Sequence, residues 1–303
     1  AGAPVDKLDR VASLFAAIRV PTASAGPQSV SAVIAERSAH WQALAEGTTT
    51  PGTPTHLPTL DSALGGGPKA GKVLVIASRP SVGKTSLASD IALAFGKAGK
   101  PVLFLSQEMT AGELIDRFVS NEGRISLEAI TTGRFDDEVT SRLVEASDQI
   151  GRLPVFIDDT PALTLADIRA KARQVQQRNG LGLLVLDYLQ LARDDGGATH
   201  RHHQIEQISR GMKQLAKELN CAVIVLSQIN RSSLQRQDGE PTLADLKESG
   251  AIEEDADAVL LLHPRDQSPD GSLLVVGILA KNRQGRRGRI ALRFEGATQR
   301  WSE

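Results

Sequence analysis

The stretch Val73-Leu74-Val75-Ile76-Ala77-Ser78-Arg79-Pro80-Ser81-Val82-Gly83-Lys84-Thr85 decides the fold of this chain. Its apolar first part, residues 73–77, predicts a buried strand, and a helix is predicted to follow it with Leu87, Ile91, Ala94 and Phe95 on the inward face. The loop between them matches the phosphate-binding pattern G-x-x-x-x-G-K-[ST], except that Ser78 replaces the first glycine. The alternative is a Gly-Lys-Thr that only begins a helix.

The chemistry predicted for this loop follows from its backbone and two of its side chains. Backbone N–H groups of such a loop and of the first helical turn surround phosphate oxygens. Lys84 is expected to reach the β- and γ-phosphates of ATP, and Thr85 is expected to hold Mg²⁺. The predicted ATP-binding residues are Ser78, Arg79, Pro80, Ser81, Val82, Gly83, Lys84, Thr85 and Ser86.

Two acidic residues are the candidates for holding the metal and activating water. Asp187 closes the apolar run 183–186, at a strand end where a carboxylate can hold a phosphate-bound metal. Tyr188 rather than a second acid follows it, so the catalytic base must come from elsewhere. Glu108 comes just after the apolar run 101–105, at the same predicted sheet edge, and is expected to activate water. In the alternatives, Asp187 only closes a turn and Glu108 is an ordinary exposed residue.

Strands and helices alternate from residue 57 onward, which predicts an α/β fold. Nearly continuous apolar strands are typical of a mostly parallel sheet with helices on both faces. A helix is predicted to begin at Thr164, because Asp167 completes a capping box three residues later. The predicted strands are 73–77, 101–105, 155–157, 183–186, 222–226, 258–262, 273–280 and 289–294. The closer spacing of the last three predicts an antiparallel extension of the sheet.

The first part of the chain predicts two helices and a linker. Amphipathic patterns cover 5–19 and 29–46, and a loose segment rich in Gly, Thr and Pro follows at 47–54. The apolar stripes of both helices need the rest of the chain or another subunit to pack on. We therefore divide the chain into a helical remnant or extension at 1–28, a linker helix and loop at 29–56, and an ATPase domain at 57–303.

The composition excludes several classes of protein. The 303 residues include 35 Lys+Arg and 36 Asp+Glu, so a surface that is basic throughout and coats duplex DNA is not expected. Aromatic residues make up 3%, too few for a broad platform that stacks bases. The one cysteine, Cys221, excludes a disulfide within the chain and is expected to be buried. No apolar run approaches the roughly 20 residues of a membrane span, and no signal peptide is recognisable, so we expect a cytoplasmic protein.

Taken in order along the chain, these motifs resemble the C-terminal RecA-like ATPase domain of DnaB-type replicative helicases. The resemblance covers about residue 50 to the end, and serine at the position of Ser78 is ordinary in that family. The segments that carry it are 77–85, 106–109, 186–191, 208–213, 226–231 and 245–250.

The resemblance implies a homohexameric ring that moves 5′ to 3′ on single-stranded DNA, with ATP bound between subunits. Gln228 matches the residue that senses the γ-phosphate. Lys281 and Arg283 match a pair that enters the neighbouring subunit's ATP site, where a cation supplied in trans stabilises charge on the transferred phosphoryl group. The alternative is that residues 281–289 form only a solvated basic loop. A primase and a helicase loader are the implied protein partners.

The resemblance also implies where DNA binds. Lys247, Glu248, Ser249 and Gly250 match the family's DNA-contacting loop, so the lysine and nearby backbone N–H groups are expected to follow DNA phosphates. The family often has arginine where this chain has Lys247, which keeps the charge but loses the planar fork. A second loop at 193–203 could face the same channel. Its histidines would also allow a metal site, although no paired Cys or carboxylate stands nearby with ligand spacing.

The front end departs from the family, and two other functions stay open. Residues 1–28 are shorter than the family's N-terminal domain, through which primase docks, so we expect a truncated chain or a shortened member. A RadA-like or KaiC-like ATPase would act in recombination or regulation, but a four-cysteine zinc site and a second P-loop are lacking. A scaffold that binds nucleotide and hydrolyses little would not need Glu108, Lys281 and Arg283 together.

Overall fold

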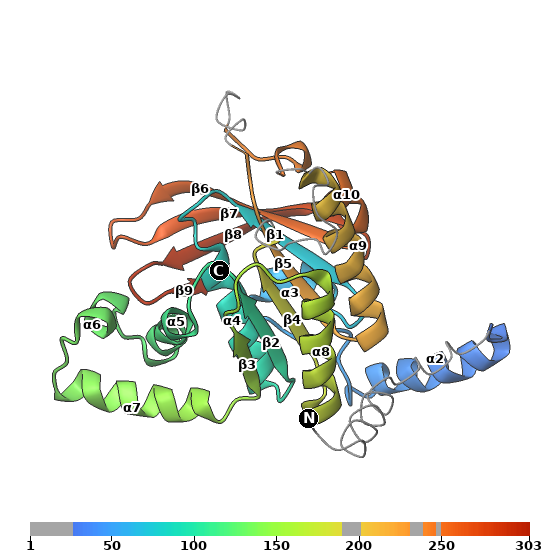
Figure 1. The fold of residues 1–303 in the computed structure, drawn as a ribbon, viewed down its shortest axis with the longest axis horizontal. Coiled ribbons are helices and arrows are strands. Elements are labelled where there is room, and N and C mark those ends of the chain that lie inside the picture. The colour runs from blue at the N-terminus through green and yellow to red at the C-terminus, as the bar shows by residue number, and fades with distance from the viewer. Residues whose placement is uncertain (1–26, 190–200, 231–238, 247–249) are drawn as a thin grey trace, which may run out of the picture. The chain divides into compact units, whose positions relative to one another are not determined.

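The computed structural model describes residues 27–189, 201–230, 239–246 and 250–303. The chain divides into two units, Ala1–Thr50 and Pro51–Glu303 (Figure 1). In the first unit, α2 (Val30–Ala45) begins after Ser29, whose hydroxyl accepts a hydrogen bond from the Ala32 N–H at 3.2 Å. This helix confirms the one predicted at 29–46. The helix predicted at 5–19 lies outside the described residues.

Residues 51–56, which the sequence assigns to the linker, belong to the second unit and form hydrogen bonds within it. The Thr53 N–H donates to the carbonyl of Pro68 at 3.0 Å. The N–H and hydroxyl of Thr55 both donate to the carboxylate of Asp61, at 2.9 and 2.8 Å. The second unit therefore begins at Pro51. The predicted roles of residues 29–56 as a linker and 57–303 as an ATPase domain stay predictions.

A nine-stranded sheet forms the centre of the second unit, with the order β3-β2-β4-β5-β1-β6-β7-β8-β9 (Figure 1). The strands are β1 (Val73–Ser78), β2 (Val102–Ser106), β3 (Val155–Asp158), β4 (Leu183–Asp187), β5 (Ala222–Gln228), β6 (Ala258–Gln267), β7 (Leu273–Asn282), β8 (Gly288–Glu295) and β9 (Arg300–Ser302). β1 to β6 pair in parallel, and β7, β8 and β9 each run antiparallel to the strand before them. The predicted α/β sheet with an antiparallel extension is confirmed. The reversal begins at β7, however, one strand later than the spacing predicts, and β9 is too short to leave a sequence pattern.

Helices cover both faces of the sheet, as the continuous apolar strands predict. Side chains of β1 alternate between two cores: Leu74 and Ile76 pack with α3, α4, α5 and α7, while Val73 and Val75 pack with α8, α9 and α10. The helices are α3 (Pro58–Ala63), α4 (Lys84–Lys97), α5 (Ala111–Gly123), α6 (Leu127–Thr132), α7 (Asp137–Gly151), α8 (Leu165–Asn179), α9 (Arg201–Leu219) and α10 (Gly250–Asp255), with the 3₁₀ turn η3 (Leu243–Asp245). None of the helices in the described part of the chain is long and apolar enough to cross a membrane.

The three helices between β2 and β3, namely α5, α6 and α7, are absent from the sequence prediction. Nevertheless, α5 carries a readable start signal. The Thr110 hydroxyl accepts from the Glu113 N–H, and the Glu113 carboxylate accepts from the Thr110 N–H at 2.8 Å, which is a capping box. Leu114 and Phe118 follow at helical spacing and are buried. The capping boxes at Thr110 and at Thr164 have the same pattern, so the sequence marks the start of α5 as clearly as the start of α8.

The end of the chain is fixed against α3 and α4. Trp301 of β9 stacks on Phe294 of β8, with ring centroids 4.9 Å apart. The carboxylate of Glu303 accepts from the Thr59 N–H at 2.7 Å, in the first turn of α3. Asp90 of α4 accepts from the Trp301 N–H at 2.8 Å. These contacts bring β8 and β9 against the helix that follows the predicted phosphate loop.

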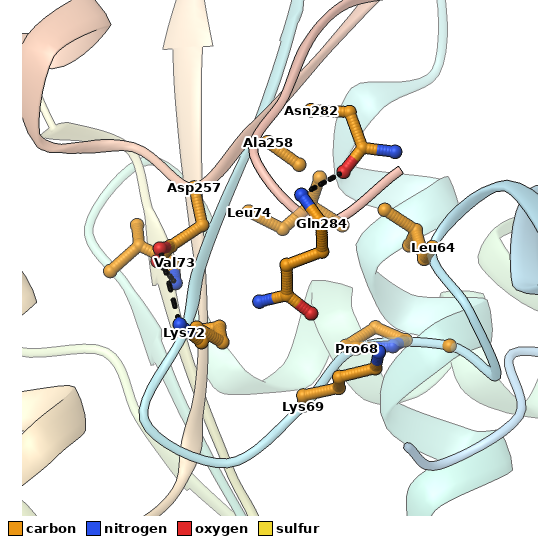
Figure 2. Close-up of a pocket in the computed structure, with 11 residues that line it drawn as sticks. Leu64, Pro68, Lys69, Lys72, Val73, Leu74, Asp257, Ala258, Asn282 and Gln284 are labelled. Atoms are coloured by element: carbon orange, nitrogen blue, oxygen red, sulfur yellow. Dashed lines mark hydrogen bonds and ion pairs between the residues drawn. The ribbon is translucent and has the colours of Figure 1, made fainter. Parts of the chain in front are cut away.

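A buried carboxylate also anchors the amino-terminal end of β1. Asp257 accepts from the Val73 N–H at 2.8 Å and pairs with Lys72 at 3.7 Å and with Lys213. Figure 2 shows Asp257, Val73 and Lys72 beside a small pocket into which Gln284 projects. The pocket lies at the opposite end of β1 from residues 78–85, so it is not part of the predicted phosphate site.

Asp90 supplies a test of the packing between α4 and β9. Its side chain is 3% exposed, and burial raises its pKa from 3.8 to about 7, although the Trp301 N–H and the Asn121 amide oppose this. The folded protein therefore keeps a proton that the unfolded chain loses near pH 3.8. Stability must fall as pH rises through that window, by on the order of a few kcal/mol.

We expect Asp90→Asn to be stabilised relative to wild type by an amount that grows with pH, because asparagine keeps an acceptor and has no charge to bury. Thermal unfolding between about pH 5 and about pH 8 measures this difference. Asp148→Asn, which removes an exposed carboxylate of α7, is the control for net charge. A difference in Tm between Asp90→Asn and wild type that does not change with pH would contradict the expectation.

Candidate active site

The loop between β1 and α4 has a backbone that demands glycine at one position. Gly83 is the N-cap of α4 and has φ +94°, in the left-handed region. A Cβ atom there would lie 3.0 Å from both Phe294 and Trp301, so space as well as conformation excludes a side chain. Ser81 also has a positive φ, of 65°. The loop is thus held in a tight curve whose N–H groups are free to bind an anion at the helix start.

Lys84 connects the loop to both predicted acids. Its ammonium nitrogen Nζ donates to Oδ1 of Asp187 and to Oε2 of Glu108, each at 3.1 Å. The hydroxyl of Thr85 donates to the other oxygen of Asp187, Oδ2, at 2.7 Å. The structure thereby brings together Lys84, Thr85, Asp187 and Glu108 at one edge of the sheet.

Strand pairing explains why the two acids meet. β2 and β4 are parallel neighbours, with Ser106 opposite Asp187. The Gln107 N–H donates to the Asp187 carbonyl at 2.7 Å and continues the ladder one residue further. Glu108 is the next residue, so it emerges beside the carboxylate of Asp187. Segments far apart in the sequence are therefore aligned by backbone hydrogen bonds alone.

Burial sets the electrostatics of Asp187. Its side chain is fully buried, and burial raises its pKa, while Lys84 and the Thr85 hydroxyl oppose that rise. A buried carboxylate is tolerated only when cations or donors satisfy it. The site is consequently built to hold positive charge against Asp187, whether from lysine or from a metal ion.

The oxygen donors present fit Mg²⁺. The Thr85 hydroxyl and the Asp187 carboxylate lie side by side and are hard ligands of the kind this ion takes. Within the described residues, no cluster of three or more His, Cys, Asp or Glu could hold a metal by itself. That agrees with an ion that binds through one or two protein oxygens, water and substrate phosphates. The histidine-rich loop at 193–203 has its side chains outside the described residues.

A cavity of about 250 Å³ opens over this cluster. Gln228, at the carboxyl end of β5, lines it together with the loop and Glu108. The lining residues are Arg79, Pro80, Ser81, Gly83, Lys84, Thr85, Ser86, Glu108, Met109, Arg117 and Gln228. Ser78 is buried in β1 beneath the loop, and Val82 is 5% exposed and packs into the core. Those two predicted ATP-binding residues therefore support the loop rather than line the cavity.

Arg117 of α5 is a cavity residue that the sequence analysis missed. Burial lowers the pKa of its guanidinium, whereas the charges of Glu113, Asp187 and Glu108 act to raise it. It therefore lines the same cavity as Lys84 and Glu108. The signal was an arginine on the inward stripe of an amphipathic helix, next to Phe118, and it needed α5 to be recognised first.

Lys281 and Arg283 lie near the amino-terminal ends of the parallel strands, opposite the carboxyl ends that carry the phosphate loop. Asn282, between them, pairs with Ala258 at the start of β6, whereas the phosphate loop follows the far end of β1. Lys281 donates to the carbonyls of Glu253 and Glu254, the latter at 3.2 Å. Arg283 donates to the Glu254 carbonyl at 2.6 Å. Both side chains thus satisfy carbonyl groups at the end of α10, and neither lines the cavity of its own chain.

The predicted DNA loop is described only at its end. Lys247, Glu248 and Ser249 lie outside the described residues, and Gly250 is exposed at the start of α10. The helix that carries Gly250 is the one whose last carbonyls bind Lys281 and Arg283.

Comparison with known proteins gives a consistent result. A family model described as DnaB-like helicase C terminal domain matches residues 52–303. The replicative DNA helicase DnaB of Geobacillus stearothermophilus is 39% identical over 248 residues, which is 80% of this chain and 54% of that protein. The replicative DNA helicase DnaC of Bacillus subtilis (strain 168) is 37% identical over 80% of this chain and 54% of its own length. The chain thus spans about half the length of the curated relatives it matches.

Solved structures agree with the sequence matches. One solved ATPase domain superimposes with a TM-score of 0.83 and 32% identity, covering 91% of this chain and 99% of that one. A DnaB-like replicative helicase, described with its interactions with primase, has a TM-score of 0.79 and 29% identity and covers 97% of this chain and 71% of its own. A KaiC-like protein from Pyrococcus horikoshii OT3, at 15% identity and a TM-score of 0.57, shares the fold alone.

We expect Gly83→Ala to weaken ATP binding by at least about tenfold, since backbone strain of this kind costs roughly 1–3 kcal/mol and the added methyl would meet two aromatic rings. Titration with a fluorescent ATP analogue measures it. Gly99→Ala is the matched control: Gly99 has φ +68° but nothing within 4 Å of its Cβ position. Equal losses in the two variants would contradict the expectation, because Gly99 lies beyond the other end of α4 and outside the phosphate loop.

Proposed function

Because the chain belongs to the DnaB-like helicase C-terminal domain family, we propose that it is the ATP-hydrolysing motor of a replicative DNA helicase. The observation that carries the proposal is the convergence of Lys84, Thr85, Asp187 and Glu108 at the carboxyl edge of the sheet. That edge is where open α/β sheets bind their ligands. The KaiC-like protein shares only the fold with this chain, whereas the family model and the relatives of about 38% identity are replicative helicases.

In the proposed reaction, the loop N–H groups and Lys84 bind the triphosphate. Lys84 leaves the two carboxylates for the β- and γ-phosphates, while Thr85 and Asp187 would hold Mg²⁺, which supplies charge neutralisation of the phosphate oxygens. Glu108 is then free to orient and deprotonate the attacking water. Arg117 adds a second cation from the same subunit, and Gln228 contacts the γ-phosphate region from β5.

The placement of Lys281 and Arg283 supports a role in trans. They lie at the amino-terminal edge of the parallel strands, so they cannot reach the cavity of their own chain. The cavity of about 250 Å³ is also smaller than the roughly 300–1,000 Å³ usual for small-molecule pockets, which leaves part of a nucleotide for a neighbour to cover. We propose a homohexameric ring in which each pair completes the next subunit's site.

DNA is proposed to bind in the centre of that ring, with movement 5′ to 3′ along a single strand. Lys247, Glu248, Ser249 and Gly250 would follow the phosphates, which needs few charges and fits a chain whose formal net charge is −1. Gly250 begins α10, and Lys281 and Arg283 bind carbonyl groups at the end of α10. A shift of the DNA loop would therefore move α10 and with it the side chains of Lys281 and Arg283.

Partners and location follow from the same proposal. One solved relative is described with its interactions with primase, and we propose that a primase and a helicase loader also meet this chain. A replicative motor works where the DNA is, so we propose the cytoplasm as its location.

ATP hydrolysis measured with and without single-stranded DNA tests the function. We expect stimulation by DNA in wild type and no hydrolysis or ATP binding in Lys84→Ala, because the ammonium group is lost from the phosphate site. Lys97→Ala, which changes a half-exposed lysine of the same helix, is the control and should behave as wild type. A negligible rate that DNA does not change would favour a nucleotide-binding scaffold. Tight ATP binding by Lys84→Ala would refute the site.

Mixing inactive variants tests the shared site. Arg283→Ala subunits keep an intact Glu108, and Glu108→Ala subunits keep an intact Arg283, so mixed rings regain complete sites at the interfaces between the two. Equimolar random mixing should restore roughly a quarter of wild-type interfaces. Glu108→Ala mixed with Lys84→Ala is the matched control and should stay inactive, because both defects lie on the same side of the interface. No recovery in the first mixture would exclude the role in trans.

A further inference from the structure

Gln299 is a buried polar side chain behind the phosphate site, in the turn between β8 and β9. It is 7% exposed and has φ +55°, a conformation that residues other than glycine rarely adopt. Nothing in the sequence marks it, since it stands in a short polar turn, Ala297-Thr298-Gln299-Arg300. A residue with a strained backbone and a buried amide persists only when its surroundings hold it in place, so its contacts are informative.

Those contacts lead directly to the active site. The amide oxygen Oε1 accepts from the hydroxyl of Ser86 at 2.7 Å and from Nη1 of Arg117. Ser86 follows Thr85 in the first turn of α4, and Arg117 lines the cavity from α5. One oxygen atom therefore joins the helix that begins the phosphate loop to the arginine that faces it.

The orientation of the amide is fixed by its other end. The Gln299 Nε2 donates to the carbonyl of Gly296 at 2.6 Å, and its backbone carbonyl accepts from Nδ2 of Asn121 at 3.1 Å. A flipped amide would set its N–H₂ group against the guanidinium of Arg117 and its oxygen against the carbonyl of Gly296. Only one orientation satisfies all these groups, and it directs the acceptor at Arg117.

We propose that Gln299 is a positioning residue that holds Arg117 toward the nucleotide phosphates; the proposal rests on the hydrolytic function argued above. Among the described residues, the hydrogen bonds of Arg117 all use Nη1, to Gln299 and to Ser86. Its remaining N–H groups are left for phosphate oxygens, which a guanidinium binds in a planar fork.

The Gln299 amide is uncharged, and this matters for its proposed role in positioning Arg117. A carboxylate at position 299 would also accept from Arg117, but it would form a buried ion pair and cancel the charge that the phosphates need. Glutamine orients the guanidinium and leaves its charge available. Glu113, Asp187 and Glu108 already favour the charged form of Arg117, so no further anion is required.

The test compares Gln299→Leu, Gln299→Glu and Arg117→Ala in the full chain. With Gln299→Leu we expect kcat for ATP hydrolysis to fall by roughly tenfold to a hundredfold, as misplaced catalytic groups usually cause, with a smaller change in ATP affinity. Arg117→Ala should lose at least as much. The double variant Arg117→Ala/Gln299→Leu should be no worse than Arg117→Ala alone, because Gln299 acts only through Arg117.

Gln299→Glu separates positioning from packing, since glutamate has the same size and still accepts a hydrogen bond. Because glutamate loses the donor to the Gly296 carbonyl, we expect its melting temperature to fall somewhat, and kcat measured well below that temperature to fall as in Gln299→Leu. It also serves if Gln299→Leu does not fold. Thr298→Ala removes a hydrogen bond to Glu295 within the same turn and should leave kcat unchanged.

Losses that multiply in the double variant, or wild-type kcat in Gln299→Glu, would overturn the proposal. So would a loss in Thr298→Ala equal to that in Gln299→Leu, because the turn rather than the amide would then matter. If Arg117→Ala hydrolyses ATP normally while Lys84→Ala is inactive, the motor function stands and this inference alone fails. Activity in Lys84→Ala would instead remove the function itself.

Discussion

The ammonium group of Lys84, held between the carboxylates of Asp187 and Glu108, is the interaction on which the site depends. Asp187 is fully buried, so it needs a cation at close range. In the proposed reaction a metal–triphosphate would satisfy every member of this cluster: Lys84 would bind phosphate, and Asp187 and Thr85 would hold the metal. Such an exchange would replace one cation beside Asp187 with another, so the buried carboxylate would keep a positive partner throughout.

The antiparallel strands β8 and β9 and the turn between them pack behind this cluster and contact both the phosphate loop and Arg117. Phe294 and Trp301 fill the space that a side chain at position 83 would take, and Gln299 fastens Arg117 to the start of α4. The antiparallel strands and this turn therefore fill space beside the loop and contact Arg117, in addition to packing in the core that they share with the parallel strands. The last residues of the sequence act on the chemistry through packing, not through contact with the nucleotide.

The two ends of the parallel strands carry different groups of functional residues. The carboxyl edge carries the phosphate loop and the acids, while the amino-terminal edge carries Lys281 and Arg283, seated on the end of α10. Lys281 and Arg283 therefore do not line the cavity of their own chain, which is the reason for proposing that they act on a neighbouring subunit. In the proposed ring, hydrolysis would then depend on assembly, and α10, which follows the predicted DNA loop, would connect that loop to Lys281 and Arg283.

The sequence by itself determined the phosphate loop, eight of the nine strands that the structure describes and the two acids, because each is a local pattern and neighbouring parallel strands bring their carboxyl ends together. It did not reveal Arg117, because the helices between β2 and β3 were not recognised, although a capping box at Thr110 marked the first of them. Gln299 had no signal at all. It lies 213 residues from Ser86 and 182 from Arg117, and only the folded sheet, which returns the chain to its own phosphate loop, decides such contacts.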